Sequence, residues 1–450
     1  MSRVCRLALT SFLIAPIASV VEGHPAGEHA PEPYAPAEQH RPTPLPDRLV
    51  LTWSDAPATS IDITYRTEPG VGPTVGEWIE ASRVLGDHKR GDIKEAERLE
   101  GSSEPFTSDL GGARMHTVKL RGLKPTTKYA YRVGDGVNWS PWGHFTTASN
   151  KPAPFEFLYF GDAQNAVRAL WSRVRREAHA ESPRAAFAVH AGDLINRSES
   201  DAEWGEWHEA AGWLNGTIPT VAVPGNHEYR VKGLWPTVSG HWRPSFSFPE
   251  NGVRGLEETC YWFDYQGVRF LALDSNTKHQ EQAEWLDRTL SDLPPTKWTI
   301  ATFHHPMYSA AKNRDNATLR KIWKPVFDKH GIDLALTGHD HAYARSGLGG
   351  PLDSDREENL ATGLRDQQGK TVYVVSVSGP KSYPLSQAWD VSRSGSGVQL
   401  YQVIRVEDDR IEYRAHRASG ELYDAFSLTK DAMGQVRLTE EAPDLPEIHE

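Results

Sequence analysis

Cysteine is nearly absent from this chain, because only Cys5 and Cys260 among 450 residues carry a thiol. Cys5 precedes an N-terminal apolar segment that is expected to be removed, which leaves Cys260 alone. A disulfide framework within the mature chain is therefore excluded, although exported proteins often use one. The fold must depend on its hydrophobic cores, with bound metal as a second candidate for stabilisation.

An excess of basic charge is also missing, since 49 Lys and Arg face 60 Asp and Glu and give a formal net charge of -11. Duplex nucleic acids and anionic lipids attract a basic field, so we expect no bulk binding to either. A small anionic substrate is still compatible, because bound metal ions reverse the local field. Apolar residues make up 38% of the chain, enough for packed cores, and the length favours two or three domains.

Long apolar runs are confined to residues 7–21, which follow Arg3 and Arg6. A basic start and a short apolar stretch are typical of a secretory signal peptide. We predict a signal peptide over 1–23 and a secreted or periplasmic protein with no membrane span after cleavage. An uncleaved N-terminal anchor is the alternative reading. The sequence does not determine the oligomeric state.

Two segments lack any apolar period and are predicted to be loose. Residues 24–46 are rich in Pro, Ala, His and Glu, as in a disordered spacer. Its His24, His29 and His40 are either solvated or weak metal chelators. Residues 431–450 form an acidic, Pro-containing tail.

Residues 47–148 have the pattern of an all-β domain. Stretches at 49–53, 61–65 and 115–120 alternate or nearly alternate, and residues 123–134 run from a turn into a strand. About 100 residues of short strands suit a β-sandwich. We interpret its aromatic residues as core rather than as a ligand-binding shelf.

Residues 152–430 have a different pattern, in which apolar strands alternate with helical stretches. We expect strands at 155–160, 186–189, 220–223, 268–273, 298–303 and 334–336, and a helix at 166–180. The later strands at 371–377 and 399–413 are expected to complete a second sheet. This pattern predicts an α/β layered domain, whose functional groups lie beyond the carboxyl ends of its strands.

Polar clusters stand at that position after five of these strands. They are Gly161-Asp162, Gly192-Asp193, Gly225-Asn226-His227-Glu228, His304-His305 and Gly338-His339-Asp340-His341. Each cluster is weak alone, but the set supplies carboxylate, carboxamide and imidazole groups. These donors suit zinc, iron or harder metals, and two metal ions can hold both the attacking and the leaving oxygen of an in-line displacement.

The order and spacing of these clusters resemble the calcineurin-like metallophosphoesterase superfamily. The β-sandwich and the run 338–345 resemble its purple acid phosphatase branch, and residues 123–133 are similar to the end of a fibronectin type III module. The resemblance covers about residues 49 to 430. It implies a fibronectin type III-like sandwich followed by a four-layer domain, in which helices flank two sheets around a dinuclear centre of Fe, Zn or Mn.

The resemblance also assigns roles residue by residue. Asp162 and His341 correspond to ligands of the first metal, Asp193 to the bridging carboxylate, and Asn226, His304 and His339 to ligands of the second metal. His227 resembles the residue that contacts phosphate and donates a proton to the leaving oxygen. His305 follows His304 directly and could exchange roles with it.

Three departures from the family pattern are visible. Asn196 stands where purple acid phosphatases have the Tyr that binds ferric iron, which places ferric specificity in doubt. Gln164 stands where many relatives outside that branch have a His ligand, so it either binds weakly or positions a water. The paired histidines of the plant enzymes are missing from residues 308–320, so substrate contacts there must differ.

Arg197 and Asn165 are further candidates near the same strand ends. Gly192 to Arg197 resembles a run of the Ser/Thr phosphatases in which the Arg binds phosphate, and a planar guanidinium matches two phosphoryl oxygens. The alternative is an ion pair with a surface carboxylate such as Glu199. Asn165 would lie just beyond the carboxyl end of the strand predicted at 155–160.

The sequence thus predicts a secreted phosphoesterase that hydrolyses monoesters of a small phosphorylated substrate by attack of a metal-activated hydroxide. A phosphodiesterase acting on nucleotides or lipid head groups is the alternative enzyme. A surface binding module with a vestigial metal site is the alternative from another class.

Overall fold

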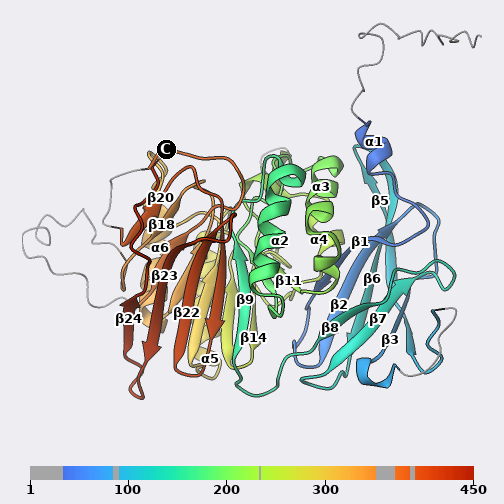
Figure 1. Ribbon diagram of the computed structural model, residues 1–450, viewed down its shortest axis with the longest axis horizontal. Coiled ribbons are helices and arrows are strands. Elements are labelled where there is room, and N and C mark those ends of the chain that lie inside the picture. The colour runs from blue at the N-terminus through green and yellow to red at the C-terminus, as the bar shows by residue number, and fades with distance from the viewer. Residues whose placement is uncertain (1–33, 85–90, 233–234, 351–369, 386–390, 450) are drawn as a thin grey trace, which may run out of the picture.

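The computed structural model describes residues 34–84, 91–232, 235–350, 370–385 and 391–449 (Figure 1). The predicted signal peptide at 1–23 and the spacer residues His24 and His29 lie outside these ranges. Within them, no helix combines the length and apolarity needed to cross a bilayer.

The N-terminal domain is a sandwich of two four-stranded antiparallel sheets, as predicted. One sheet has the order β1 (Asp47–Thr52), β2 (Ser60–Thr67), β6 (Gly111–Arg121) and β5 (Ser102–Ser108). The other has the order β4 (Glu97–Glu100), β3 (Val75–Glu80), β7 (Lys128–Gly134) and β8 (Gly143–Thr146). The pattern of the sequence did not reveal β4 and β5, because none of their residues is buried.

The second domain contains two seven-stranded sheets with helices on their outer faces, which confirms the predicted layered α/β architecture. The first sheet has the order β11 (Thr220–Ala222), β10 (Ala188–His190), β9 (Phe155–Phe160), β21 (Leu400–Val406), β22 (Arg410–Arg417), β23 (Leu422–Lys430) and β24 (Val436–Glu440). The second has the order β14 (Tyr261–Tyr265), β15 (Val268–Ala272), β16 (Trp298–Thr302), β17 (Leu334–Thr337), β19 (Val372–Val375), β18 (Tyr343–Arg345) and β20 (Arg393–Gly395).

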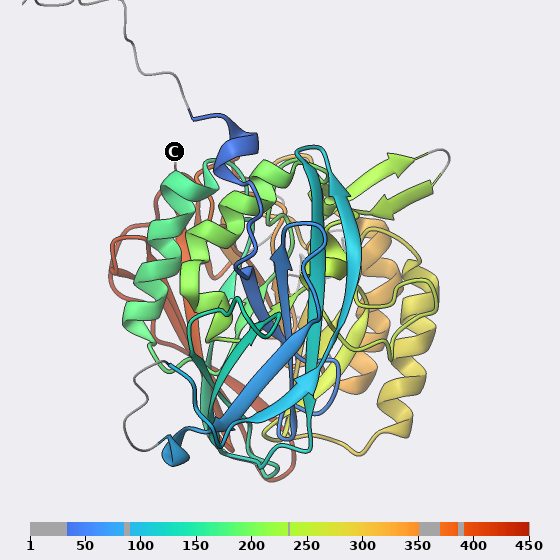
Figure 2. The same ribbon diagram turned by 90° about the vertical axis from the view of Figure 1, so that its right-hand side faces the viewer.

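Helices flank this pair of sheets on both sides, as Figure 2 shows with green helices on one side and yellow to orange helices on the other. The helices α2 (Ser172–Glu181) and α3 (Asp201–Ala211) lie with the first sheet, and α5 (His279–Asp292) and α6 (Ala317–His330) with the second. On the second side, Trp323 and Phe327 of α6 share a core with Phe303 and Leu286. Apolar faces of helices buried against sheets stabilise this kind of domain.

The remaining elements are short. They are α1 (Pro36–Gln39), α4 (Trp242–Ser245), the hairpin β12 (Tyr229–Lys232) and β13 (Trp235–Val238), the π-helical turn η2 (Val167–Trp171), and the 3-10 turns η1 (Ala81–Arg83), η3 (Gly212–Gly216) and η4 (Asn226–Glu228).

Parallel pairing explains why the polar clusters meet. The strands β9, β10 and β11 pair in parallel, and so do β15, β16, β17 and β19. Parallel strands end at the same edge of their sheet. The loops that follow β9, β10, β11, β16 and β17 therefore emerge together at one edge of the domain.

The two domains pack against each other through apolar and charged contacts. Trp53 of the sandwich contacts Phe187, with ring centroids 5.8 Å apart. Asp201, at the start of α3, forms ion pairs with two arginines of the sandwich, Arg48 at 2.6 Å and Arg66 at 3.3 Å. The side chains of all three charged residues are buried, so these ion pairs fix the position of one domain against the other.

The two segments predicted to be loose are partly ordered. Residues 36–39 form α1, and His40 is buried 3.3 Å from Glu209 while its carbonyl accepts a hydrogen bond from Arg66. At the other end, β24 pairs with β23, and Glu447 accepts hydrogen bonds from Ser394. Long-range pairing of this kind leaves no periodic pattern in the sequence.

The expectation that both C-terminal stretches complete a second sheet is confirmed for residues 371–377 and corrected for residues 399–413. The strands β21 to β24 extend the sheet of β9, because β21 pairs antiparallel with β9. Of the described strands after residue 370, β19 and β20 join the other sheet. Both sheets are thus assembled from segments far apart in the chain, and Figure 1 shows β9 beside the C-terminal strands.

Candidate metal centre

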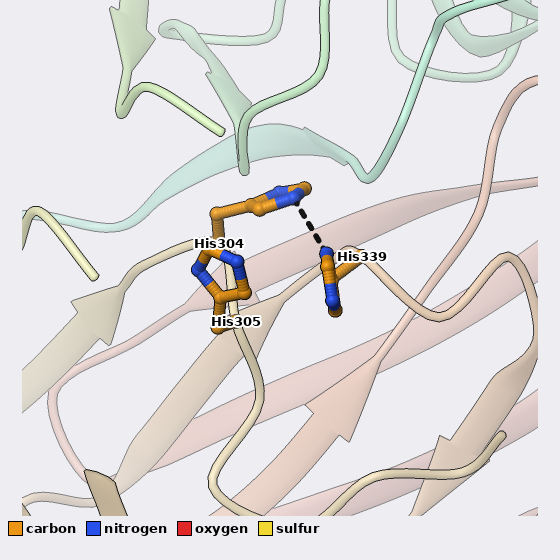
Figure 3. A group of neighbouring side chains, drawn as sticks. All are labelled: His304, His305 and His339. Carbon is orange, nitrogen blue, oxygen red and sulfur yellow. Dashed lines mark hydrogen bonds between the residues drawn. The ribbon is translucent and has the colours of Figure 1, made fainter. Parts of the chain in front are cut away.

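Metal-ligating side chains gather where the five loops meet. Ligand atoms of Asp162, Asp193 and His304 all lie within 4.8 Å of one another, and the same holds for His304, His305 and His339. Figure 3 shows how His304 and His305, which follow β16, face His339 from the loop after β17. Residues from strand ends more than 140 positions apart in the chain therefore contribute to one cluster.

The backbone at this cluster is held in an uncommon conformation. Four of the predicted ligands have positive φ angles: 29° at Asp162, 53° at Asp193, 74° at His339 and 46° at His341. Non-glycine residues rarely adopt this region, and each costs of order 1–3 kcal/mol. Such strain persists only where surrounding contacts impose it, and it concentrates at functional sites.

Two glycines allow the loops to approach this closely. A Cβ atom on Gly225 would lie 2.1 Å from Asp193 Oδ1, and one on Gly338 would lie 2.5 Å from Asp162 Oδ2. Any larger residue would displace a predicted ligand. Close contact with a predicted ligand therefore explains the glycines at 225 and 338.

The half of the cluster around His304 brings together four atoms that could bind a metal ion. His304 Nδ1 donates to the carbonyl of Ala191 at 2.9 Å, so Nε2 of the neutral ring carries the lone pair. That Nε2 lies 3.1 Å from Asn226 Oδ1, 3.1 Å from His339 Nδ1 and 3.3 Å from Asp193 Oδ2. Imidazole, amide and carboxylate donors aimed at one point fit a transition metal ion.

The half around Asp162 contains an orphaned carboxylate oxygen. Asp162 Oδ2 accepts a hydrogen bond from the backbone of His339 at 2.6 Å, whereas its Oδ1 is buried without a partner among the described residues. A buried oxygen without a donor is costly, and a cation would satisfy it. This observation favours a metal ion beside Asp162.

Gln164 lies inside that half. Its Nε2 donates to Asp193 Oδ2 at 2.8 Å and lies 3.1 Å from His341 Nε2. The amide nitrogen thus stands between the predicted bridging carboxylate and a predicted ligand of the first metal. Asn165 Nδ2 donates a hydrogen bond to Gln164 Oε1 at 3.4 Å, and this contact helps to orient the Gln164 amide.

The charges of the cluster are strongly coupled. Burial raises the pKa of Asp162, and the neighbouring Asp193 raises it further. Burial acts on Asp193 in the same direction, but the facing His304 outweighs it and holds the pKa of Asp193 below its usual range. Burial opposes protonation of His304, yet Asp193 raises the pKa of that imidazole to about 9.

The outer histidines of the cluster are disposed to stay neutral. Burial, followed by the charge of His304, lowers the pKa of His305 to about 3, and burial also lowers the pKa of His339. Burial and then Lys381 lower the pKa of His341 to about 3. Neutral imidazoles are the form that binds metal.

His227 lies at the edge of the cluster with one nitrogen free to act. Its backbone N–H donates to Asp193 Oδ1 at 3.0 Å, and its Nδ1 donates to the carbonyl of Asn196 at 2.6 Å. Its Nε2 lies 3.9 Å from Asp193 Oδ2, and 27% of the side chain is exposed. The ring is therefore oriented by Asn196 and open to solvent beside the shared carboxylate.

Sequence reasoning quoted Glu228 within its motif but gave it no role. This carboxylate is fully buried and accepts N–H groups from Asp193 at 2.8 Å and Gly225 at 2.7 Å through Oε2, and from Leu194 at 2.8 Å through Oε1. Burial, together with Asp193, raises the pKa of Glu228 to about 7. Glu228 thus holds the loop of Asp193 against the loop of Asn226. In the sequence, its position directly after Asn226-His227 was the feature that could have indicated this role.

Two other predicted site residues have their side chains engaged elsewhere. Arg197 is exposed, and its Nε donates to Glu203 at 2.7 Å, whereas Glu199 pairs with Arg230. His305 Nδ1 lies 2.9 Å from Ser275 Oγ, so the hydroxyl orients this ring beside His304. Arg197 remains a prediction, since contact with a substrate would require its pair with Glu203 to open.

Arg314 is a second residue that sequence reasoning missed. Its Nη2 donates to His339 Nε2, and its Nε lies 3.3 Å from Asp340 Oδ1. The family pattern concerns histidines within residues 308–320 and gives no role to an arginine there. The structure places a cation there, in direct contact with a predicted ligand.

Comparison with known families agrees with this geometry. Residues 155–343 match the model of the calcineurin-like phosphoesterase family, and residues 46–147 match that of the purple acid phosphatase N-terminal domain. The two matches follow one another along the chain and coincide with the two domains of the structure.

The relatives with similar sequences include plant acid phosphatases. Purple acid phosphatase 15 of Arabidopsis thaliana is 27% identical over 267 residues, which cover 52% of this chain and 49% of the relative. Probable purple acid phosphatase 20 of the same plant is 23% identical, covering 72% and 71%. The chain thus spans about half the length of the first of these relatives.

Solved structures show the same fold. A purple acid phosphatase from yellow lupin (Lupinus luteus) seeds superposes with a TM-score of 0.70 at 18% identity, covering 87% of this chain and 75% of that one. The structure of PhoD superposes with a TM-score of 0.62 at 13% identity, covering 90% and 94%. At this identity, the likeness concerns the fold alone.

Proposed function

We propose that this chain, which joins a purple acid phosphatase N-terminal domain to a calcineurin-like phosphoesterase domain, is a secreted dinuclear metal enzyme that hydrolyses phosphate monoesters. The observation that carries the proposal is the convergence of Asp193, Asn226 and His339 around His304 Nε2, at 3.1 to 3.3 Å. Side chains from four separate loops meet there with the donor chemistry of a metal site.

Two metal ions would be held by residues of both halves of the cluster. Asp162 and His341 would bind the first, Asn226, His304 and His339 the second, and Asp193 both. The orphaned Oδ1 of Asp162 supports the first position. Bound metal ions supply a water nucleophile that is ionised at neutral pH and neutralise charge on the phosphoryl group. Zinc, iron and manganese are the candidates, and Asn196 in place of a tyrosine argues against ferric iron.

His227 would hold the proton for the leaving group. Because Asn196 takes Nδ1–H, the catalytic proton must reside on Nε2, the atom that faces Asp193 and solvent. A proton donor at this position accelerates the reaction by roughly 10²–10⁴-fold in enzymes of many classes. Arg197 is a further candidate for contact with phosphoryl oxygens once it leaves Glu203.

Substitution of the shared carboxylate tests the proposal directly. Asp193→Ala should lose bound metal and turnover of an aryl phosphate together, measured by elemental analysis and initial rates. The turn residue Asp408, replaced by Ala, is a matched control that should retain both. Full activity in the Asp193 variant would contradict the scheme.

Substitution of the proton donor separates its role from metal binding. His227→Ala should keep both metals and lose rate most with poor leaving groups, because good leaving groups need no proton. A series of aryl phosphates of graded leaving-group pKa measures this slope. An equal loss across the series would argue against the donor role. Comparing an aryl phosphate with a bis-aryl phosphate tests the preference for monoesters over diesters.

A further inference from the structure

A fully buried arginine lies between α2 and the first sheet of the second domain. All three nitrogen atoms of the Arg175 guanidinium are buried and lack a hydrogen-bond partner among the described residues. Its carbon atom Cζ lies 5.5 Å from the ring centroid of Phe160 in β9. A ring face attracts a cation, but it does not accept the five N–H groups of a guanidinium. The donors of Arg175 therefore need a ligand that the described part of the chain does not supply.

Arg175 keeps its charge at neutral pH. Burial lowers the pKa of this guanidinium to about 10, which is still well above neutrality. No carboxylate in the described ranges forms an ion pair with it. Taking a charge out of water without a counter-ion is costly, and an accompanying anion removes much of that cost. The position of Arg175 therefore favours a negative charge beside α2.

Two further donors lie in the same layer of the core. His190 of β10 is the register partner of Phe160, so both side chains point to the same face of the sheet, with ring centroids 5.3 Å apart. Trp207 of α3 meets the ring of His190 edge-on, at 5.5 Å. Trp207 Nε1 and both ring nitrogens of His190 are buried and have no partner among the described residues. Three neighbouring elements, α2, α3 and β10, thus each direct an unsatisfied polar side chain into this layer.

These three side chains offer many hydrogen-bond donors and a single acceptor. The guanidinium has five N–H groups, the indole has one, and a neutral imidazole has one N–H and one lone pair. Burial, followed by the charge of Arg175, lowers the pKa of His190 to about 3, so this imidazole is neutral. A water molecule would bring protons of its own to a group that offers them one acceptor. An anion only accepts hydrogen bonds and also neutralises Arg175, so it matches the group better.

We propose that Arg175, His190 and Trp207 bind a halide ion, with chloride as the natural ligand. Trp171 adds a further ring, 5.9 Å from His190 and stacked on Trp207 at 6.3 Å, so the surroundings are aromatic. Phosphate and sulfate dianions would lose more hydration there than a halide, which favours the weakly hydrated monovalent ion. The ion would hold α2 and α3 against β9 and β10, the strands that precede two of the predicted metal ligands. None of the three residues is itself a predicted metal ligand, so the inference goes beyond the proposed function and does not depend on it.

Thermal unfolding of the full, metal-loaded protein tests the site. Chloride is exchanged for gluconate at constant ionic strength, because gluconate is too bulky for a fully buried site. An ion that binds only the folded state should raise Tm by about 2–5 °C for each tenfold rise in its concentration above the dissociation constant. Arg175→Met removes the charge at similar volume and should abolish this rise with chloride. Arg176→Met, at the exposed neighbouring position on α2, is the matched control and should retain it.

The same measurements separate this site from the metal centre. Chloride bound to the metals would raise Tm equally in wild type and in Arg175→Met, and that result would overturn the halide site. Equal Tm values of wild type in chloride and in gluconate would overturn it too.

Crystals of wild type soaked in bromide decide the question even if Arg175→Met does not fold. Anomalous scattering should place bromide within hydrogen-bond distance of the Arg175 guanidinium, and a site there without anomalous signal would contradict the proposal. Neither measurement uses phosphatase activity, so failure of the halide site and failure of the proposed function are distinguishable.

Discussion

The half of the metal centre around His304 differs from the half around Asp162 in what lies between its donor atoms. Around His304, Nε2 faces the acceptor atoms of Asn226 and Asp193 directly, at 3.1 and 3.3 Å. Around Asp162, the amide nitrogen of Gln164 stands between Asp193 Oδ2 and His341 Nε2. In one half the predicted ligands face one another directly, and in the other an amide donor of the protein lies between them.

This difference bears on metal affinity. A metal ion at the His304 half displaces only protons of its own imidazole ligands, whereas a metal ion at the Asp162 half must also displace the N–H groups of Gln164. We therefore expect two unequal sites, with the tighter one at Asn226, His304 and His339. The orphaned Oδ1 of Asp162 keeps the weaker site favourable despite the amide.

The largest effect is expected from breaking the tighter half. His304→Ala removes the imidazole that contacts all three other donors, so the second metal should be lost and turnover should fall by about 10³-fold, near the loss from removing a catalytic group. His305→Ala is the matched control, because His305 contacts Ser275 instead, and it should keep the metal. Isothermal titration with zinc and an aryl phosphate assay distinguish the two. Metal loss only in the His305 variant would reverse the assignment.

A smaller effect is expected from loosening the connection between the loops. Glu228→Gln keeps the size of the side chain but leaves one oxygen where two accept N–H groups from Asp193, Gly225 and Leu194. Metal affinity should fall by about 10- to 100-fold, as for other residues that orient ligands. Thermal unfolding should show a loss of about 2 kcal/mol, the order for a buried unsatisfied donor. Unchanged affinity would mean that Glu228 serves stability alone.

The smallest expected effect is an increase in metal affinity at the weaker site. Gln164→His replaces an amide donor by an imidazole that can bind metal, so the weaker site should tighten by about tenfold, the low end of the range for changes near a metal. The stoichiometry of zinc at low concentration should then move from near one toward two. Competition with a chelator of known affinity measures this. A decrease in affinity would show that the amide oxygen of Gln164 is itself a ligand.

The accuracy of the sequence analysis varied with the range of the contacts involved. Apolar strands such as 155–160 and 298–303 were predicted because burial on both faces leaves a run of apolar residues. The exposed strands β4 and β5 leave no such run and were missed. The pairing of β21 with β9 joins residues more than 240 positions apart, which local patterns cannot register.

By itself, the sequence determined the fold class and which polar residues would stand at strand ends, because periodicity and parallel pairing fix both. Only the tertiary structure decided how those residues interact. It placed the Gln164 amide inside one half of the cluster, buried Glu228 beneath two loops, and brought Arg314 to His339. Each of these depends on the side-chain direction of residues distant in sequence, which is set when the two sheets pack and not by any local pattern.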